Sequence, residues 1–260
     1  MPAAAFDQLA PAYDARFTAS DLGQILRRRV RRWLDQAFAP GQFVLELNCG
    51  TGEDALYLAR RGVRVLATDA SAEMLAVAAS KIAGTTLSNA ITRRQVALEN
   101  LDELRQGYAG AFDGALSNFG GLNCVADLGA LGQSLAALLA PGARAVLCVM
   151  GPIVPWEWAW FLAHGAVRTA FRRLAPDGVP WRDLVVRYPS IGDTRRGFAP
   201  HFRVRRAGGL GVFVPPTYAE PWAQRHPRLV EWLDRCERRV EQWPVVPWLG
   251  DHYLLELERR

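Results

Sequence analysis

The stretch VLELNCGTGEDALYLA, residues 44–59, joins a predicted strand to a predicted helix through a turn that contains two glycines. The strand carries an acid, Glu46, just before the turn, and the turn carries Gly50 and Gly52. A strand, a glycine turn and a helix start together present backbone N–H groups and the positive end of a helix dipole to a ligand. We therefore predict that this turn binds a small molecule.

Predicted strands and helices alternate along the chain on either side of the turn. Apolar residues recur at helical spacing over residues 20–38. Short apolar strands are predicted at residues 43–47, 63–69, 91–96, 112–117 and 143–150. The last run is continuously apolar, which is typical of a strand in the middle of a parallel sheet. This alternation predicts an α/β fold with a doubly wound, mostly parallel sheet and right-handed crossovers.

The composition changes after Pro152. Trp156 and Trp160 stand four residues apart in a tryptophan-rich stretch that is expected to form a helix. That helix either packs on the sheet as a buried cover or places both tryptophans in the wall of an apolar or aromatic pocket. A third interpretation is a helix that rests on anionic lipid, because arginines follow it. Further predicted elements are a strand at 202–206, a turn at 208–209, a strand at 210–214 and a final strand at 252–257.

The composition fits a protein that folds around its own core. The chain has 260 residues, half of them hydrophobic, so it needs neither a metal nor a disulfide to fold. Its four cysteines are scattered and show no metal-ligand spacing with histidine, so no metal site is predicted. Without a recognisable signal peptide or membrane-spanning window, we expect a reduced, cytoplasmic protein with no stable membrane insertion.

The net charge of +5 comes almost entirely from arginine. That composition is typical of a GC-rich bacterial genome. The alternative is an anionic partner, either a nucleic acid or an acidic small molecule. The net charge alone does not distinguish these explanations.

Two acids indicate which small molecule the turn binds. The residues from Gly50 to Ala55 fit the pattern G-x-G-x-x-A, which on its own would indicate NAD. A fixed carboxylate at Glu46, however, is unfavourable beside a pyrophosphate and suits a ligand with a cationic amino group. Asp69 ends the next strand, where an acid accepts hydrogen bonds from both ribose hydroxyls of either ligand.

With these features, the sequence resembles the class I S-adenosylmethionine-dependent methyltransferases. Their acid followed by a G-x-G-x-G loop is matched by residues 46–52, except that Asn48 replaces the first glycine. Further matches, in chain order, are residues 6–14, 67–75, 96–101, 112–119 and 139–143. Asparagine is the non-glycine residue that best tolerates a positive φ, and its amide could add a hydrogen bond to the ligand.

The resemblance implies a seven-stranded sheet with a terminal antiparallel hairpin and a helical cap insertion. Residues 1–40 are expected to form a helical segment that covers the cofactor, and residues 41–150 a Rossmann-like core that binds it. Residues 151–260 are expected to hold the acceptor and to supply the closing strands of the same domain.

The family pattern also implies which residues contact the ligands. The expected cofactor is S-adenosylmethionine, which leaves as S-adenosylhomocysteine. The residues expected to bind it are Tyr13, Glu46, Asn48, Gly50, Thr51, Gly52, Asp69, Ala70, Met74, Leu98, Glu99 and Ser117. The residues expected to contact the acceptor are Asn118, Phe119, Trp156 and Trp160. Asn118 and Phe119 follow a central strand, where open sheets bind their ligands.

A general base is optional for methyl transfer, because the sulfonium is already activated and positioning does much of the work. Among four histidines, each of which also suits a structural or solvated role, His201 is the first candidate for a base. The expected reaction is methyl transfer to an oxygen or nitrogen atom of a small molecule, which could be aromatic or anionic. No oligomeric state is predicted.

Three other functions remain open from the sequence. An RNA methyltransferase is favoured only by the basic charge, because residues 117–120 lack the acid/amide-Pro-Pro-aromatic signature of enzymes that methylate base amines. Nucleic acid is therefore not the expected partner. A non-catalytic protein that binds S-adenosylmethionine and a dinucleotide-dependent oxidoreductase are the remaining alternatives.

Overall fold

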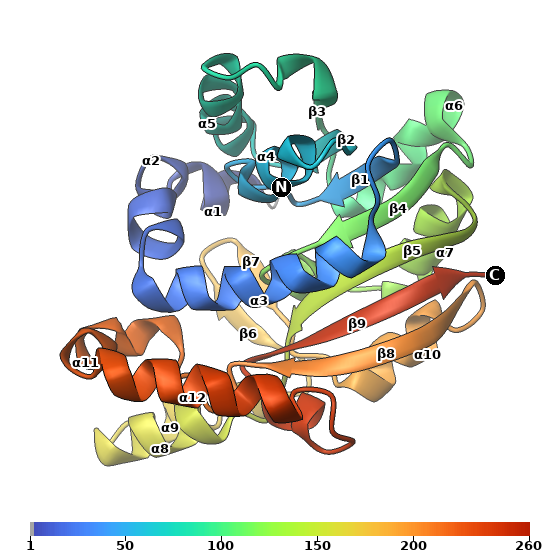
Figure 1. Ribbon diagram of the computed structural model, residues 1–260. Helices are drawn as coiled ribbons and strands as arrows, with labels where there is room; N and C mark the ends of the chain where they lie inside the picture. The colour runs from blue at the N-terminus through green and yellow to red at the C-terminus, as the bar shows by residue number, and fades with distance from the viewer. Residues whose placement is uncertain (1–2) are drawn as a thin grey trace.

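A seven-stranded sheet runs through the computed structural model, which describes residues 3–260 (Figure 1). Its strands are β1 (Phe43–Leu47), β2 (Arg64–Asp69), β3 (Ile91–Gln95), β4 (Phe112–Ser117), β5 (Leu139–Met150), β8 (Phe202–Leu210) and β9 (His252–Arg259). They are ordered β3-β2-β1-β4-β5-β9-β8. The first five pair in parallel, and β9 is antiparallel to both β5 and β8. This confirms the predicted α/β class and the mostly parallel sheet.

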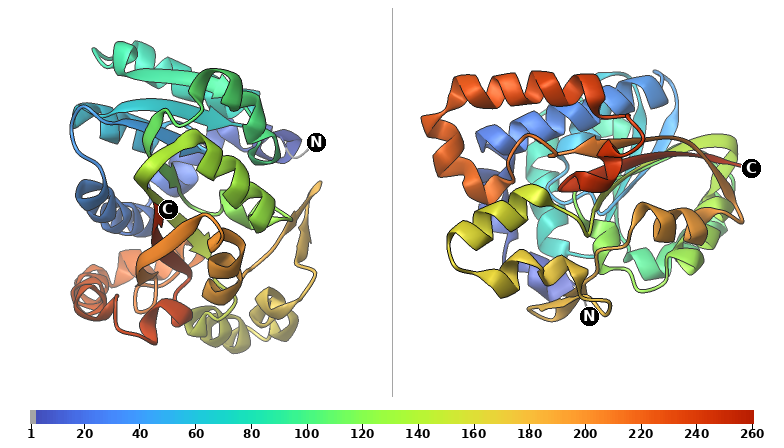
Figure 2. Two further views of the ribbon diagram at one scale, coloured as in Figure 1. Left: turned by 90° about the vertical axis from the view of Figure 1, so that its right-hand side faces the viewer. Right: turned by 90° about the horizontal axis from the view of Figure 1, so that it is seen from below.

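Helices cover both faces of this sheet (Figure 2). One face packs against α3 (Asp21–Ala37), α4 (Glu53–Arg60), α5 (Ala72–Ala83), α11 (Glu220–Arg225) and α12 (Pro227–Val240). The other face packs against α6 (Arg105–Tyr108), α7 (Leu128–Leu138) and α10 (Ile191–Phe198). Successive strand residues alternate between the two cores, as Val44 and Leu45 do, because strand side chains point to opposite faces.

Shorter elements complete the chain. The N-terminal segment contains α1 (Ala3–Asp7), α2 (Ala10–Tyr13) and a π-helical turn, η1 (Asp14–Thr18). The region after β5 contains α8 (Pro155–Ala163), α9 (Val167–Ala170) and a separate antiparallel pair, β6 (Val179–Trp181) and β7 (Leu184–Val186). Short 3₁₀ segments cover Ser88–Ala90, Leu98–Leu104, Gly121–Cys124, Arg172–Leu174, Thr217–Ala219 and Val246–Leu249, and the second of them is kinked at Asn100.

The predicted turn at 208–209 is wrong, and so is the strand at 210–214. Strand β8 continues through both glycines to Leu210 and pairs with β9 along that length. A Cβ at Gly208 would lie 2.5 Å from the Trp33 ring, and one at Gly209 would lie 2.8 Å from the Val246 carbonyl oxygen. These glycines therefore permit close packing rather than a turn.

The sheet order positions the functional edge. Strands β1, β2 and β3 follow one another toward one side of the sheet, and β4 and β5 follow one another toward the other side. The direction of chain progress therefore reverses between β1 and β4, and ligands of open sheets bind at such a point. The last residues of β1, β2, β4 and β5, which are Leu47, Asp69, Ser117 and Met150, lie along one edge. This is the edge where the structure has its large cavity.

Candidate active site

A cavity of about 500 Å³ opens at the carboxyl ends of β1, β2, β4 and β5. Most of the residues predicted to bind the cofactor line it, namely Tyr13, Glu46, Asn48, Gly50, Thr51, Asp69, Ala70, Met74, Leu98 and Glu99. The predicted acceptor residues Asn118 and Phe119 line it as well. Gly52 and Ser117 are buried and do not line the wall.

The glycine turn has the backbone shape that its sequence suggests. Asn48, Gly50 and Gly52 all have positive φ, at 47°, 53° and 77°. Asparagine therefore takes a left-handed conformation where the family pattern has glycine, as predicted.

The Asn48 amide makes two hydrogen bonds within the protein. Its Nδ2 donates to the Asn118 carbonyl oxygen at 2.8 Å, and its Oδ1 accepts from Ser117 Oγ at 2.6 Å. The amide thus ties the end of β4 to the turn, and the hydrogen bond from its second N–H to the ligand stays a prediction. The Asn48 side chain also needs Gly121, where a Cβ would lie 2.1 Å from Asn48 Cγ.

Asp69 is fixed at the end of β2 by backbone donors. Its Oδ2 accepts from the Gly50 N–H at 2.8 Å, and its Oδ1 accepts from the Ser71 N–H at 2.9 Å. Burial raises the pKa of Asp69 above its ordinary value, while these N–H groups oppose that rise. The carboxylate thus reaches the cavity in one orientation, and each oxygen keeps a lone pair for a ligand hydroxyl.

Glu46 is a buried acid with one carboxylate oxygen that accepts no hydrogen bond from the described residues. Only 2% of it is exposed, and its Oε2 has no hydrogen-bond partner within residues 3–260. Burial, with a further contribution from Asp54, raises the pKa of Glu46 well above its ordinary value. A buried carboxyl with a free oxygen costs free energy unless a donor satisfies it. A ligand with a cationic amino group would supply that donor.

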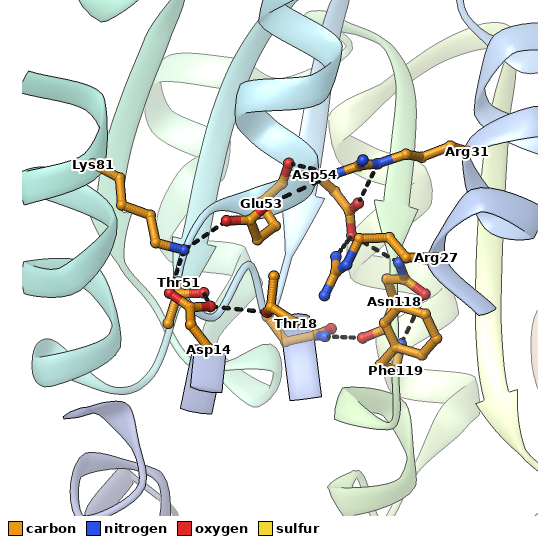
Figure 3. A network of polar contacts seen from close by, with 11 residues as sticks. Asp14, Thr18, Arg27, Arg31, Thr51, Glu53, Asp54, Lys81, Asn118 and Phe119 are labelled. Atoms are coloured by element: carbon orange, nitrogen blue, oxygen red, sulfur yellow. Dashed lines mark hydrogen bonds and ion pairs between the residues drawn. The ribbon is translucent and has the colours of Figure 1, made fainter. Parts of the chain in front are cut away.

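A buried ion pair links α3 to the first turn of α4, which in turn contacts the end of β4 (Figure 3). Arg27 Nη1 lies 2.7 Å from Asp54 Oδ2, and the same oxygen accepts from Asn118 Nδ2 at 2.7 Å. The Asn118 Oδ1 in turn accepts from the Phe119 N–H at 3.0 Å, which holds Phe119 at a φ of 47°. Arg27 is 7% exposed and lines the cavity. Its guanidinium uses one N–H on Asp54, and its Nε has no partner within the described chain.

The N-terminal segment lies over the glycine turn. Asp14 Oδ1 accepts from Thr51 Oγ1 at 2.7 Å, and Lys81 Nζ bridges Asp14 to Glu53 (Figure 3). Tyr13, from the same segment, lines the cavity. Burial, together with nearby acids such as Asp54 and against the effect of Arg27, raises the pKa of Tyr13 to about 12. The phenol therefore stays protonated at neutral pH and can donate a hydrogen bond.

The far side of the cavity is apolar apart from one cation. It lies beside β4 and β5 and includes Phe119, Cys124, Met150, Arg172, Val179, Trp181, Val186 and Tyr188. The strands β6 and β7 close it by contacting the N-terminal segment. The rings of Trp181 and Phe6 lie 5.6 Å apart, and Arg182 Nη1 donates to the Ala5 carbonyl oxygen at 2.7 Å.

Trp156 and Trp160, predicted as acceptor residues, do not line the cavity. Trp156 Nε1 donates to the Phe213 carbonyl oxygen at 2.7 Å, and its ring packs on Trp222. Trp160 stacks on His164 with ring centroids 4.8 Å apart. Trp156 therefore packs on α11, whereas Trp160 packs on the end of its own helix.

His201, the predicted candidate for a base, lies away from the cavity. His201 precedes β8, whose first residue pairs with Arg259 at the end of β9. Because β8 runs parallel to β5, its start lies at the amino edge of the sheet, opposite the glycine turn. No histidine lines the cavity within residues 3–260.

Two further findings concern the described chain as a whole. Between residues 3 and 260, no three histidine, cysteine, aspartate or glutamate side chains gather as metal ligands would. Over the same residues, no helix has the length and the apolar character that a membrane crossing needs.

Known proteins resemble this chain in sequence. The family described as Methyltransferase domain matches residues 44–142. A demethylmenaquinone methyltransferase of Thermus thermophilus is 35% identical over 176 residues, which cover 66% of this chain and 73% of that protein. The chain belongs to the class I S-adenosylmethionine-dependent methyltransferases. A demethylmenaquinone methyltransferase of Clavibacter sepedonicus is 31% identical to this methyltransferase, and the match covers 58% of the chain and 59% of the relative.

Solved structures agree with the fold of this methyltransferase. An S-adenosylmethionine-dependent methyltransferase from Mesorhizobium loti superposes with a TM-score of 0.57 at 20% identity, covering 90% of this chain and 98% of the other. The cyclase SpnF superposes with a TM-score of 0.65 at 16% identity, covering 98% and 94%. At these identities the likeness shows the fold alone. The predicted family and enzyme class are confirmed by the sequence matches.

Sequence reasoning missed several residues that line the methyltransferase cavity. Arg27 belongs to the run RRRVRR, in which no pattern separates a buried arginine from its neighbours. Asp54 follows the glycine turn in the first turn of α4, so its position near the ligand could have been found. Arg172, Trp181 and Tyr188 come from segments whose placement depends on tertiary contacts.

Proposed function

We propose that this enzyme transfers the methyl group of S-adenosylmethionine to an oxygen or nitrogen atom of a small apolar molecule. One observation carries the proposal: a single cavity joins an acid-rich side at β1 and β2 to a mostly apolar side at β4 and β5. A cationic cofactor suits the first side, and an apolar acceptor suits the second.

The residues present fit the cofactor. The fixed carboxylate of Asp69 supports a role as acceptor of the ribose hydroxyls, and the unpartnered Glu46 Oε2 supports a role as acceptor of the amino group. The free N–H groups of Arg27 suit the cofactor's carboxylate. The remaining predicted contacts are Tyr13, Asn48, Gly50, Thr51, Gly52, Ala70, Met74, Leu98, Glu99 and Ser117, with Gly52 and Ser117 acting through the shape of the turn.

The same acids disfavour a dinucleotide. A pyrophosphate in the glycine turn would lie beside Glu46, Asp54 and Asp69, and like charges close together in a buried site repel strongly. A ligand with an ammonium and a sulfonium group is attracted instead. This charge distribution supports S-adenosylmethionine over NAD.

The chemistry needs little from the protein beyond positioning. S-adenosylmethionine supplies an activated methyl group, so an acceptor lone pair forms the new bond as the carbon–sulfur bond breaks and its electrons pass to sulfur. The chain orients both partners through the turn, Asn118 and Phe119, and it excludes water with the N-terminal segment and strands β6 and β7. An oxygen that is already ionised, or a neutral amine whose product later releases its proton to solvent, needs no base for the transfer itself.

We also propose the predicted division of labour along the chain. Residues 1–40 would cover the cofactor, 41–150 would bind it and 151–260 would hold the acceptor, with residues 1 and 2 outside the described part. The relatives named for demethylmenaquinone, a quinone, support a small apolar acceptor. The far side of the cavity supports the same class, and its size suits a small molecule.

Calorimetric titration tests this proposal. The purified protein is titrated with S-adenosylhomocysteine, S-adenosylmethionine and NAD. We expect the first two to bind and NAD to give no heat. Binding of NAD alone would contradict the proposal. Transfer of radiolabelled methyl groups to RNA, lost on raising the salt concentration, would replace the small-molecule acceptor with a nucleic acid.

A further inference from the structure

The charges in the cavity are unevenly distributed. Asp69 ends β2 and Glu46 lies near the end of β1, whereas Arg172 lies on the side of β5 together with Met150. Three strand spacings separate β2 from β5, which is about 14 Å. The acids can therefore attract one ligand group while Arg172 attracts another at the opposite end.

Arg172 is held in place from two sides. Its Nη2 lies 3.0 Å from Glu157 Oε1, and its guanidinium lies over the Phe161 ring at 5.2 Å from the centroid. The Arg172 side chain is 29% exposed, and Glu157 is its one ion-pair partner within residues 3–260. An arginine fixed in this way loses little freedom when it binds an anion, and its remaining donors can pair with a carboxylate.

A buried frame supports Arg172. Glu157 is 1% exposed, and its Oε2 lies 2.7 Å from Arg173 Nη2. Arg173 also pairs with Asp251 Oδ1 at 2.6 Å, and it donates to the Gly151 carbonyl oxygen at 3.3 Å. The buried Arg173 lies between the carboxylates of Glu157 and Asp251 and holds Glu157 in place, and Glu157 in turn pairs with the Arg172 guanidinium.

The neighbouring wall is apolar and fixed as well. Asn123 is fully buried, and its Nδ2 donates to the carbonyl oxygens of Met150 at 3.0 Å and Arg187 at 2.6 Å. This amide joins the end of β5 to the segment that carries Tyr188. Trp181 completes the wall from the end of β6. An acceptor here would have an apolar or aromatic body beside a single cation.

We propose that Arg172 selects an acceptor that carries a carboxylate on an apolar or aromatic body. The inference rests on the proposed function, and it narrows the acceptor to an organic acid. The carboxylate would pair with Arg172, which leaves the nucleophilic atom of the acceptor on the side that faces β4 and the glycine turn. The acids around the glycine turn would repel the same carboxylate. Attraction by Arg172 and repulsion by these acids would therefore orient the acceptor in the same way.

A pair of matched probes tests this inference. The protein, saturated with S-adenosylhomocysteine, is titrated with trans-cinnamate and with trans-cinnamamide, which share a shape and differ in charge. We expect the wild type to bind cinnamate about tenfold more tightly, as one charge-assisted pair provides. Arg172→Gln should remove that preference, and Arg172→Lys should keep part of it because the charge remains without the planar fork.

A neighbouring arginine supplies the control. Arg168 lies exposed on α9 and does not line the cavity, so Arg168→Gln should keep the full preference for cinnamate. Equal binding of the two probes by the wild type, no binding of cinnamate, or a preference that survives Arg172→Gln would each overturn the inference. The titration with S-adenosylhomocysteine comes first in every variant. Its failure in the wild type would count against the proposed function, whereas its success without a cinnamate preference would count against the role of Arg172 alone.

Discussion

The two sides of the cavity are built differently. The side at β1 and β2 consists of strand ends and a backbone turn, and its Asp69 is fixed by the N–H groups of Gly50 and Ser71 from the same short segments. The side at β4 and β5 consists of side chains from segments far apart in the sequence. There Arg172 depends on Glu157, which depends on Arg173.

This difference suggests how the fold combines one cofactor with varied acceptors. A site made by the backbone and strand ends stays in place when surface residues change. A site made by side chains of inserted segments can change its charge and shape without disturbing the sheet. In this chain the second side is apolar with one cation, and the first is rich in acids.

The largest expected effect comes from Asp69→Asn. Loss of charged hydrogen bonds to two ribose hydroxyls should weaken binding of S-adenosylhomocysteine by about 100-fold, measured by calorimetry. Asp113→Asn is the matched control, because Asp113 also accepts a backbone N–H, that of Phe43, but lies at the opposite edge of the sheet. Equal losses in the two variants would show that the effect is structural rather than a loss of ligand contacts.

Gly121→Ala should disturb the contact between the Asn48 side chain and the segment after β4, where the two sides of the cavity meet. The new Cβ would meet Asn48 Cγ, so we expect a loss of about 1–3 kcal/mol in the free energy of unfolding, measured with denaturant. Asn48→Gly removes the obstructing side chain and tolerates the positive φ. The double variant should therefore be more stable than Gly121→Ala alone. Additive losses would contradict the proposed dependence of Asn48 on Gly121.

Glu46 should make both binding and stability depend on pH. Its pKa is raised in the folded chain, so the folded state holds a proton that the unfolded state releases, and stability falls as pH rises from the ordinary carboxyl range to the raised pKa. A cationic amino group favours the ionised carboxylate. The affinity for S-adenosylhomocysteine should therefore rise with pH over the same window, by at most about tenfold per pH unit. Calorimetry in buffers of different ionisation enthalpy would detect the released proton.

Glu46→Gln is the control for this prediction. Glutamine cannot ionise, so the variant should lose the proton release and the pH dependence in that window while it keeps its fold. Proton release that is unchanged in Glu46→Gln would assign the titration to another group.

The smallest effect is expected at the contact that closes the cavity. Arg182 has a φ of 55° and donates to Ala5 and Gln8. Arg182→Gly relieves the left-handed strain and removes these bonds, so stability should stay within about 1 kcal/mol. Release of S-adenosylhomocysteine should become about fivefold faster, measured by stopped flow. Arg182→Asn, which also tolerates this φ, should behave alike, and unchanged release in both would exclude a closing role.

The sequence predicts the first side of the cavity much better than the second. The residues Glu46, Asn48 and Asp69 lie at or next to the carboxyl ends of β1 and β2, and a parallel sheet brings such ends to one edge whatever the rest of the chain does. Arg172 and Tyr188 have no comparable rule, because contacts such as those of Asn123 decide where they lie. The surroundings of Trp156 and Trp160 could not be predicted for the same reason. Helical spacing predicts that two side chains share one face of a helix, but not which element packs against that face.

The most direct test is a crystal structure of the wild-type protein with S-adenosylhomocysteine. We expect the ribose hydroxyls on Asp69, the amino group beside Glu46, and the sulfur directed toward Phe119 and the side of Arg172. A ligand bound in the reverse direction, with its sulfur toward β3, or bound outside this cavity would contradict the division of the site into a cofactor side and an acceptor side.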